Sequence, residues 1–435
     1  MTSSRLRDTA TSASLAVAVT LALAMAAAPE ATARAPAVPQ DTLPVAQAVS
    51  QALAANPMLR AARLKAEAAR DRVPRAGALP DPELSFGLMN RMVGDLGSTM
   101  DPMTMNQLQL TQMLPWPGKL GFAAQRARRL AQADQLDADD VEQQLVASVK
   151  SIYYQLAYMD RALTIMSSSR DLLRNFFQVS QAMYAVGSGL QQDVLQAQVG
   201  VAKMTEDITV MGAQRVAMVA RLNALLGRDA TTPVGTLQLP DAEGDLPGAD
   251  SLMALAARQR PKLRAAQERA AAAEAGYRGA RRQLFPDLMV GLSYGQRPQF
   301  GDMATLMLGI RLPIWAGSRQ LPLRHEMQAM QAMAEADTQN VYNETYARLV
   351  ELRAEAERDR TLSRLYATAV VPQAQASVDA ALAAYRVGKV NYMSLVDNQM
   401  TVNRYQTESV RLVAAYHKAV AEIAALVGTD IGGGQ

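Results

Sequence analysis

The sequence predicts a mainly helical protein with a small β part, built from two copies of one long helical-hairpin unit. Three observations support this fold class. The chain of 435 residues matches itself at a spacing of about 200 residues. Each copy contains a segment of about 65 residues with almost no proline, which is typical of one very long helix. Each copy also contains two short segments in which apolar residues alternate, as they do in half-buried strands.

Residues 1–33 have the pattern of an export signal. Arg5 and Arg7 precede an apolar stretch from Leu15 to Ala28, and Ala31-Thr32-Ala33 offers a small-residue cleavage site. The apolar stretch is shorter than the roughly 20 residues that a membrane-spanning helix needs. We therefore expect a signal peptide over 1–33. The chain has no cysteine, so we expect no acylated cysteine as an N-terminal lipid anchor.

Five matched segments in the same order define the duplication. The pairs are 56–62 with 260–266, 79–81 with 285–287, 114–116 with 312–315, 184–187 with 385–388, and 225–227 with 426–428. We assign 34–227 to the first repeat and 251–428 to the second. A linker rich in Pro, Gly and Asp fills 228–250, and 429–435 is predicted to be a flexible tail.

Each repeat is predicted to contain a helix, a β-hairpin and a long helical hairpin, in that order. In the first repeat the helix covers about 57–76, the β-hairpin about 82–114 and the helical hairpin about 119–227. In the second repeat the β-hairpin covers about 286–314 and the helical hairpin about 318–428. The clearest strand carries Leu306, Leu308, Ile310 and Leu312 on one face, alternating with Met307, Gly309 and Arg311.

The helical hairpins are predicted from length and from turn residues. A helix of 65 residues is about 100 Å long, which no globular core needs. In the second copy Pro322 and Pro372 interrupt the pattern. Gly187 and Gly388 predict the turns, and the first returning helix carries a coiled-coil seam from Val194 to Leu225 that only Arg215 breaks.

Four strands with one apolar face suit a tilted crossing of the hydrocarbon layer of a membrane. An open four-stranded sheet leaves two edges unpaired, and each unpaired backbone group costs several kcal/mol in lipid. Known single-chain barrels begin at eight strands. Either the strands are soluble, or several chains share one barrel; the strand count alone does not set how many.

The two tryptophans occupy matched positions. Trp116 and Trp315 each stand where a strand leads into a long helix. Tryptophan at that level predicts an aromatic belt at the membrane interface. The alternative is a ring that closes a small core at the corner between strand and helix.

The duplicated unit and its Tyr-x-x-Gly turns, each followed by a helix start that contains Asp, resemble the TolC family of outer-membrane efflux proteins. The resemblance implies a homotrimer in the outer membrane of a Gram-negative-type bacterium, with a shared 12-stranded transmembrane β-barrel and an α-barrel tunnel across the periplasm. It implies a passive exit duct in a tripartite efflux system. The implied partners are a periplasmic adaptor (membrane fusion protein), an inner-membrane pump of the RND type and outer-membrane lipid.

The same resemblance implies a gate at the periplasmic helix tips, built from acidic side chains and tyrosines. The matching positions are Tyr184, Gly187, Asp193, Tyr385, Gly388 and Asp397. Ser394 and Val390 stand where the family pattern often has a second Asp and an Arg. Each Asp is also a favourable residue at a helix start, because a carboxylate there complements the helix dipole.

Methionine is frequent, with 24 residues, and it crowds the first β-hairpin and its loop. The candidates there are Met89, Met92, Met100, Met103 and Met105. Thioether sulfur prefers soft ions such as Cu(I) and Ag(I). With Pro115-Trp116-Pro117-Gly118-Lys119, this pattern is similar to the heavy-metal branch of the family and predicts efflux of copper or silver, or of a divalent cation. The alternative is methionine as an adaptable apolar filler.

No catalytic residue, enzyme activity or cofactor is predicted. The chain has two histidines, His325 and His417, and no phosphate loop or nucleophile elbow. A net charge of +3, with both signs mixed along the chain, gives no reason to expect a nucleic-acid partner. Two other functions stay open: a soluble periplasmic coiled-coil adaptor or scaffold, and the exit duct of a type I protein-secretion system.

Overall fold

The computed structural model describes residues 43–94, 96–97 and 101–430. The predicted signal peptide, Met100 and residues 431–435 of the predicted tail therefore lie outside the described residues. Across the described part of the chain, none of the helices carries an apolar stretch long enough to cross a membrane.

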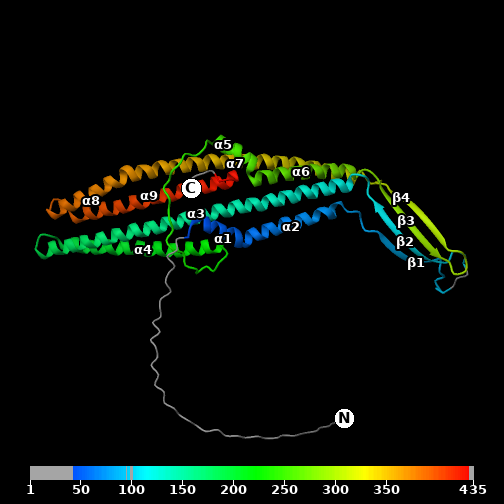
Figure 1. Ribbon diagram of the computed structural model, residues 1–435, viewed down its shortest axis with the longest axis horizontal. Helices are drawn as coiled ribbons and strands as arrows, with labels where there is room; N and C mark the ends of the chain where they lie inside the picture. The colour runs from blue at the N-terminus through cyan, green and yellow to red at the C-terminus, as the bar shows by residue number, and fades with distance from the viewer. Residues whose placement is uncertain (1–42, 95, 98–100, 431–435) are drawn as a thin grey trace, which may run out of the picture. The chain divides into compact units, whose positions relative to one another are not determined.

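In the described residues two helices, two strands and a long helical hairpin follow one another, and the same order then repeats (Figure 1). The elements are α1 (Val45–Ala55), α2 (Pro57–Gly77), β1 (Glu83–Met89), β2 (Met105–Leu114), α3 (Lys119–Ala185), α4 (Gln191–Leu225), α5 (Ala249–Gln259), α6 (Pro261–Arg282), β3 (Asp287–Gln296), β4 (Met303–Arg311), α7 (Gln320–Leu365), the π-helical segment η1 (Tyr366–Val370), α8 (Val371–Arg386) and α9 (Tyr392–Val427).

Each half begins with two helices, where the sequence predicted one. The short helices α1 and α5 are followed by Asn56 and Arg260, which are extended because each precedes the proline that starts the next helix. The Asn56 side chain also accepts hydrogen bonds from the first N–H groups of α2. These two helices were not predicted because 11 residues make too few turns for a clear apolar period. The helix α5 also includes the last two residues of the predicted linker.

All four strands form one antiparallel sheet in the order β1-β2-β3-β4. The central pair joins the two halves, since β2 pairs with β3 and places Leu110 opposite Leu292. Among the described residues β1 pairs only with β2 and β4 only with β3. The sheet therefore has two open edges, as the sequence predicted.

The two long helices differ. The 67 residues of α3 are continuous, whereas the second copy is divided into α7, η1 and α8. Between Asp359 and Gly388 the second copy has two more residues than the first has between Asp160 and Gly187. The wider π-helical turn lies inside this interval and takes up part of the insertion. Pro372 follows that turn, so it does not end the helix.

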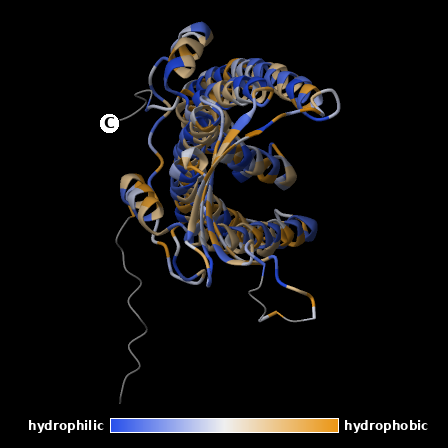
Figure 2. Cartoon of the chain, turned by 90° about the vertical axis from the view of Figure 1, so that its right-hand side faces the viewer, coloured by the Kyte–Doolittle hydropathy of each residue, from blue (hydrophilic) through white to orange (hydrophobic). Residues whose placement is uncertain are grey.

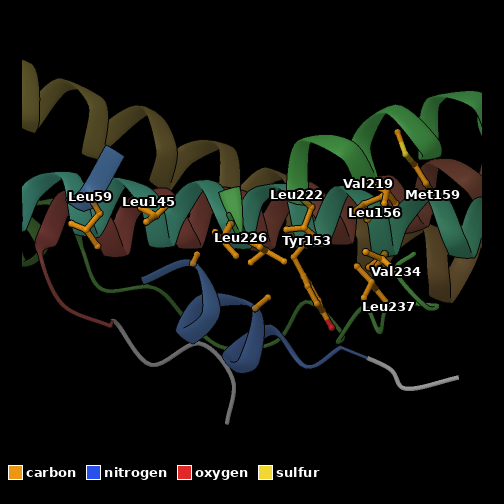
Figure 3. Packing of buried hydrophobic residues seen from close by; sticks show 14 residues of the cluster. Leu59, Leu145, Tyr153, Leu156, Met159, Val219, Leu222, Leu226, Val234 and Leu237 are labelled. Atoms are coloured by element: carbon orange, nitrogen blue, oxygen red, sulfur yellow. The ribbon is translucent and has the colours of Figure 1, made fainter. Parts of the chain in front are cut away.

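The helices are held by three buried clusters, one in each half near the linker and one near the hairpin turns. Figure 3 shows the first cluster, which contains Leu59 of α2, Leu145 and Leu156 of α3, and Leu222 of α4. The linker residues Val234 and Leu237 are buried in the same cluster. Hydrophobic and hydrophilic residues are interleaved along the helices in Figure 2, as expected of elements that bury one face each.

Arg215, the one break in the predicted seam of α4, has a structural reason. Its guanidinium forms an ion pair with the buried carboxylate of Asp160 on α3. Its Nη2 also donates to the carbonyl oxygens of Val234 and Gly235, at 3.2 and 3.1 Å. The seam is interrupted where the helix hairpin fastens the linker.

Candidate functional site

The strand register sorts the side chains of the sheet into two faces. We call the first the apolar face, and its members are Leu84, Phe86, Leu88, Leu108, Leu110, Leu114, Leu288, Val290, Leu292, Tyr294, Leu306, Leu308 and Ile310, with Asn106, Gln112, Gln296 and Ala304. The opposite, polar face carries Ser85, Gln107, Gln109, Thr111, Ser293 and Thr305, together with glycines and methionines.

The apolar face is largely exposed, and the polar face is buried only along β3. Phe86 is 68% exposed and Leu308 74%, whereas Gly291, Ser293 and Gly295 on the polar face of β3 are buried. A soluble antiparallel sheet covers its apolar face and wets the polar one. An outward apolar band with a polar interior is the pattern of strands that face lipid.

The motif from Pro115 to Lys119 builds the corner where β2 leads into α3. The Lys119 side chain is buried, and its Nζ donates to Asp287 Oδ1 at 2.7 Å and to the Phe285 carbonyl at 2.9 Å. The backbone N–H of Trp116 donates to the same Asp287 oxygen at 2.8 Å. The ring of Trp116 stacks on Phe285, with centroids 5.4 Å apart. The motif thus ties the first half to the start of β3.

Trp315, at the matched corner of the second half, has a different environment. Its side chain is 72% exposed, whereas Trp116 is partly covered by Phe285. Trp116 therefore packs at a corner, as in the alternative that the sequence left open. The exposed ring of Trp315 has the placement that an interfacial anchor needs. The membrane-interface role of either ring stays a prediction.

The two hairpin turns share one backbone geometry. Gly187 and Gly388 have φ of +76° and +69°, in the left-handed region that favours glycine. Each glycine N–H bonds the carbonyl of the tyrosine three residues earlier, Tyr184 or Tyr385, at 3.0 Å. The next residue bonds one carbonyl further back, which completes a Schellman cap. The predicted turns are therefore rigid helix ends.

The structure brings two of the predicted gate residues together across the repeats. The Tyr385 hydroxyl donates to Asp193 Oδ2 over 3.4 Å, and Tyr385 is only 3% exposed. Burial, together with the nearby Asp193 carboxylate, raises the pKa of Tyr385 to about 12, so the phenol keeps its proton and remains a donor. Tyr392 of α9 lies edge-on to Tyr385, with ring centroids 5.7 Å apart.

The other predicted gate residues do not join this contact. Tyr184 is 48% exposed and Asp397 is exposed on α9. Ser394 is engaged in the cap of α9, where its N–H and hydroxyl both donate to Asn391 Oδ1. Val390 packs against the buried cluster near the turns.

Sequence reasoning missed the fully buried Tyr392, whose hydroxyl has no hydrogen-bond partner among the described residues. Asn391 followed three residues later by Ser394 is a helix-start signal that could have placed Tyr392 at the first position of α9.

The methionines of the first β-hairpin are only partly gathered. Met89 lies directly opposite Met105 in the register. Met92 and Met103 are exposed, and Met100 lies outside the described residues. In the described part of the chain, no group of three or more His, Cys, Asp or Glu residues could hold a metal ion.

The model of the outer membrane efflux protein family matches residues 48–228 and 252–429, which are most of the chain. The chain belongs to this family. The resemblance predicted from the duplicated unit and its turns is thereby confirmed.

Individual relatives agree with the family match. The pyoverdine export outer membrane protein OpmQ of Pseudomonas putida is 24% identical over 384 residues, spanning 81% of this chain and 79% of that protein. The outer membrane protein VceC of Vibrio cholerae superposes with a TM-score of 0.76 at 16% identity, over 89% of this chain and 97% of that one. The outer-membrane channel OprN gives a TM-score of 0.72 at 21% identity, over 90% of each chain.

Membership of the family explains the open edges and the exposed apolar face of the sheet. The protein is an outer-membrane efflux channel with the trimeric fold that the resemblance implied. Three chains contribute four strands each to a β-barrel and their long helices to a tunnel. The open edges of β1 and β4 are then the edges along which neighbouring chains join, and the apolar face is the face toward lipid. The family works by passive conduction, with adaptors and inner-membrane pumps as its partners.

Proposed function

We propose that this protein is the exit duct of a tripartite efflux system and that it opens at the helix tips where Tyr385 meets Asp193. The observation that carries the gate is the hydrogen bond between these side chains, which joins α8 of the second half to α4 of the first. Moving the two hairpins apart must break this contact. A gate needs a contact of this kind, weak enough to yield and placed between the parts that move.

The electrostatics of the tip suit the same role. Asp193 lies in the first turn of α4, where the helix dipole favours a carboxylate. Three chains would bring three copies of Asp193 and of the exposed Asp397 around one opening. A ring of carboxylates attracts cations and repels itself when fully ionised, so it selects charge and favours widening.

A groove beside the tips supports docking of a periplasmic adaptor. Its lining includes Leu195 and Val199 of α4 and Met393, Val396 and Met400 of α9. Leu195 and Val199 are exposed apolar side chains at helical spacing, which is how a helix-in-groove partner is recognised. The inner-membrane pump, predicted to be of the RND type, would supply the driving energy through that adaptor.

The soluble-scaffold alternative is weakened by the sheet. A soluble protein would leave the large apolar face in water, where it would drive aggregation. Three substrate classes stay in competition: copper or silver ions, favoured by the paired thioethers of Met89 and Met105, organic compounds such as drugs, and secreted proteins. Deletion of the gene is expected to raise the sensitivity of cells to copper or silver salts. Unchanged metal tolerance with a lost secreted protein would favour the third class.

The gate is tested by the conductance of the purified trimer in planar bilayers. We expect Asp193→Asn, which removes the charge and weakens the Tyr385 contact, to raise the single-channel conductance several-fold. Arg258→Gln, on α5 in the other half of the chain, is the control and should leave the conductance unchanged. The proposed gate would be refuted if the Asp193→Asn trimer had the same conductance as the wild type and were blocked by added cations to the same extent.

A further inference from the structure

All six methionines of the four strands lie on the polar face of the sheet. They are Met89 of β1, Met105 and Met113 of β2, Met289 of β3, and Met303 and Met307 of β4. The apolar face has no methionine within these strands, and every Leu, Ile, Val and Phe of the strands lies there. Methionine and the aliphatic residues are completely separated.

Hydrophobicity alone does not produce this separation. A methionine used only as an apolar filler would be as suitable on the lipid-facing side as a leucine. Here the methionines instead lie on the face that carries Gln, Ser and Thr. In a membrane barrel that face lines the water-filled interior. The chain has no cysteine, so these thioethers are the sulfur that the strands present to the transport route.

The register gathers the six side chains into two bands. In the outer band Met89 lies opposite Met105, and Met303 lies opposite Gly295. The Met105 sulfur lies over that glycine, only 2.6 Å from where a Cβ would be. Met105 therefore extends across β3 toward Met303, and three thioethers from three strands share one level of the barrel.

The inner band repeats this arrangement closer to the helices. Met113 lies opposite Met289, and the Met289 methyl group lies over Gly309, 3.0 Å from where a Cβ would be. Met307, two residues before Gly309, contributes the third thioether. In both bands a glycine leaves room for a methionine to lie along the sheet. In the inner band the Met113 sulfur accepts a hydrogen bond from Arg311 Nη1 at 3.6 Å, so a metal ion there would have to displace this guanidinium.

A row without sulfur separates the bands. It consists of Ser85, Gln109, Ser293 and Thr305, which are consecutive partners across the sheet. Eight residues separate Met105 from Met113 on β2, which is about 26 Å at 3.3 Å per residue. On β2 the two bands therefore lie at opposite ends of the strand, whereas on β4 Met307 lies near the middle, four residues or about 13 Å from Met303.

We propose that the two methionine bands bind soft monovalent metal ions, Cu(I) or Ag(I), as successive sites inside the barrel. This rests on the proposed function, since an ion must first be delivered into the duct. Thioethers are neutral soft ligands that need not lose a proton, and two or three of them suit these ions. The three chains of the trimer place three copies of each band around the interior. Sites of modest strength at two levels let an ion enter and also leave.

The test compares a lumen variant, with all six of these methionines replaced by Leu, with a control variant that carries Met58→Leu, Met330→Leu and Met333→Leu. The control methionines are exposed on helices outside the sheet. Leucine keeps the volume and removes the sulfur. Ag(I) binding to the purified trimer is measured by titration calorimetry with silver nitrate. We expect at least tenfold weaker binding in the lumen variant and wild-type binding in the control.

Two triple variants, one for each band, keep the test decisive if the sixfold variant does not assemble. Each should lose part of the Ag(I) stoichiometry while native mass spectrometry still shows a trimer. Wild-type Ag(I) binding in the lumen variant, or in both assembled triple variants, would overturn the proposal.

Complementation of a deletion strain separates this failure from failure of the proposed function. If the wild-type chain restores no efflux of either silver or organic dyes, the proposed role in tripartite efflux is wrong. If wild type and lumen variant restore dye efflux and silver tolerance equally, only the methionine proposal fails. The expected outcome is restored dye efflux by both and silver tolerance by the wild type alone.

Discussion

The two halves of the chain use matched corners and tips in opposite ways. At the strand–helix corner the first half is closed, with Lys119 buried on Asp287 and Trp116 stacked on Phe285, whereas Trp315 of the second half is exposed. At the hairpin turns the second half is closed, with Tyr385 buried, whereas Tyr184 of the first half is exposed. The duplication has kept the backbone turns and changed the surroundings of the side chains. Where one copy packs inside its own chain, its counterpart stays free for lipid or for a neighbouring chain.

At a third matched position both halves bond the linker, but with different side chains. Arg215 of α4 and Tyr416 of α9 stand in equivalent places, each the same number of residues before the glycine that ends its half. Arg215 donates to the Val234 carbonyl at 3.2 Å, and the Tyr416 hydroxyl donates to the Glu243 carbonyl at 2.9 Å. Both fasten the linker to the returning helix. The comparison teaches that a repeated sequence position predicts location better than it predicts contacts.

The largest expected effect is at the closed corner. Lys119→Met removes the cation that pairs with Asp287 at 2.7 Å and leaves a largely covered carboxylate with the Trp116 N–H as its hydrogen-bond donor. We expect a loss of about 3 kcal/mol in stability, because breaking a buried ion pair from one side is costly. The measurement is the temperature at which the detergent-solubilised trimer dissociates. Arg319→Met, at the exposed basic residue of the open corner, is the matched control and should change little. Equal changes in dissociation temperature for the two variants would show that the two corners contribute equally to stability.

At the hairpin turns we expect a smaller difference between the two halves than at the strand–helix corners. Tyr385→Phe removes the hydroxyl that donates to Asp193, and Tyr184→Phe removes an exposed hydroxyl. A neutral phenol donating to a carboxylate over 3.4 Å contributes on the order of 1 kcal/mol. Only Tyr385→Phe should therefore loosen the closed state and increase the entry of a bulky antibiotic into cells. Increased entry with Tyr184→Phe instead would place the gate contact between chains.

The smallest expected effect is a loss of stability at low pH, through the contact between His417 and the linker. His417 of α9 is buried, and its Nε2 contacts the carbonyl oxygens of Pro240 and Asp241 at 3.0 and 3.2 Å. Burial lowers the pKa of His417 below its ordinary value of 6.5, although both carbonyls oppose the shift. Below pH 6.5 the unfolded chain takes up this proton more readily than the folded chain, so stability falls with acid.

The measurement is the dissociation temperature of the trimer at pH 7.5 and at pH 5.5. His417→Gln should reduce the difference between the two values, and His325→Gln, at an exposed histidine, should preserve it. An undiminished pH difference in His417→Gln would exclude this histidine as its source.

Long elements were predictable from the sequence because their periodic signals accumulate over many residues. The 67-residue α3 and the alternating residues of β4 are of this kind. The 11-residue α1 and α5 and the π-helical segment η1 were not predicted, since the first two are too short and the third depends on an insertion that only the duplication reveals.

Contacts between distant segments were the part that the sequence did not reveal. Asp287 was not recognised as the partner of Lys119, because 168 residues separate them. Tyr385 and Asp193 were both named as candidates, but their pairing depends on how the two hairpins pack. The methionine bands depend on register, since a shift of one residue would move every side chain of a strand to the other face.

The central claim is that each chain brings four lipid-facing strands to a barrel that only several chains can close. Native mass spectrometry of the purified exported chain in detergent tests it most directly, with conductance of a planar bilayer measured on the same sample. The account predicts a complex of three chains that requires detergent and adds discrete conductance steps to the bilayer. A monomer that stays soluble without detergent and leaves the bilayer insulating would contradict it.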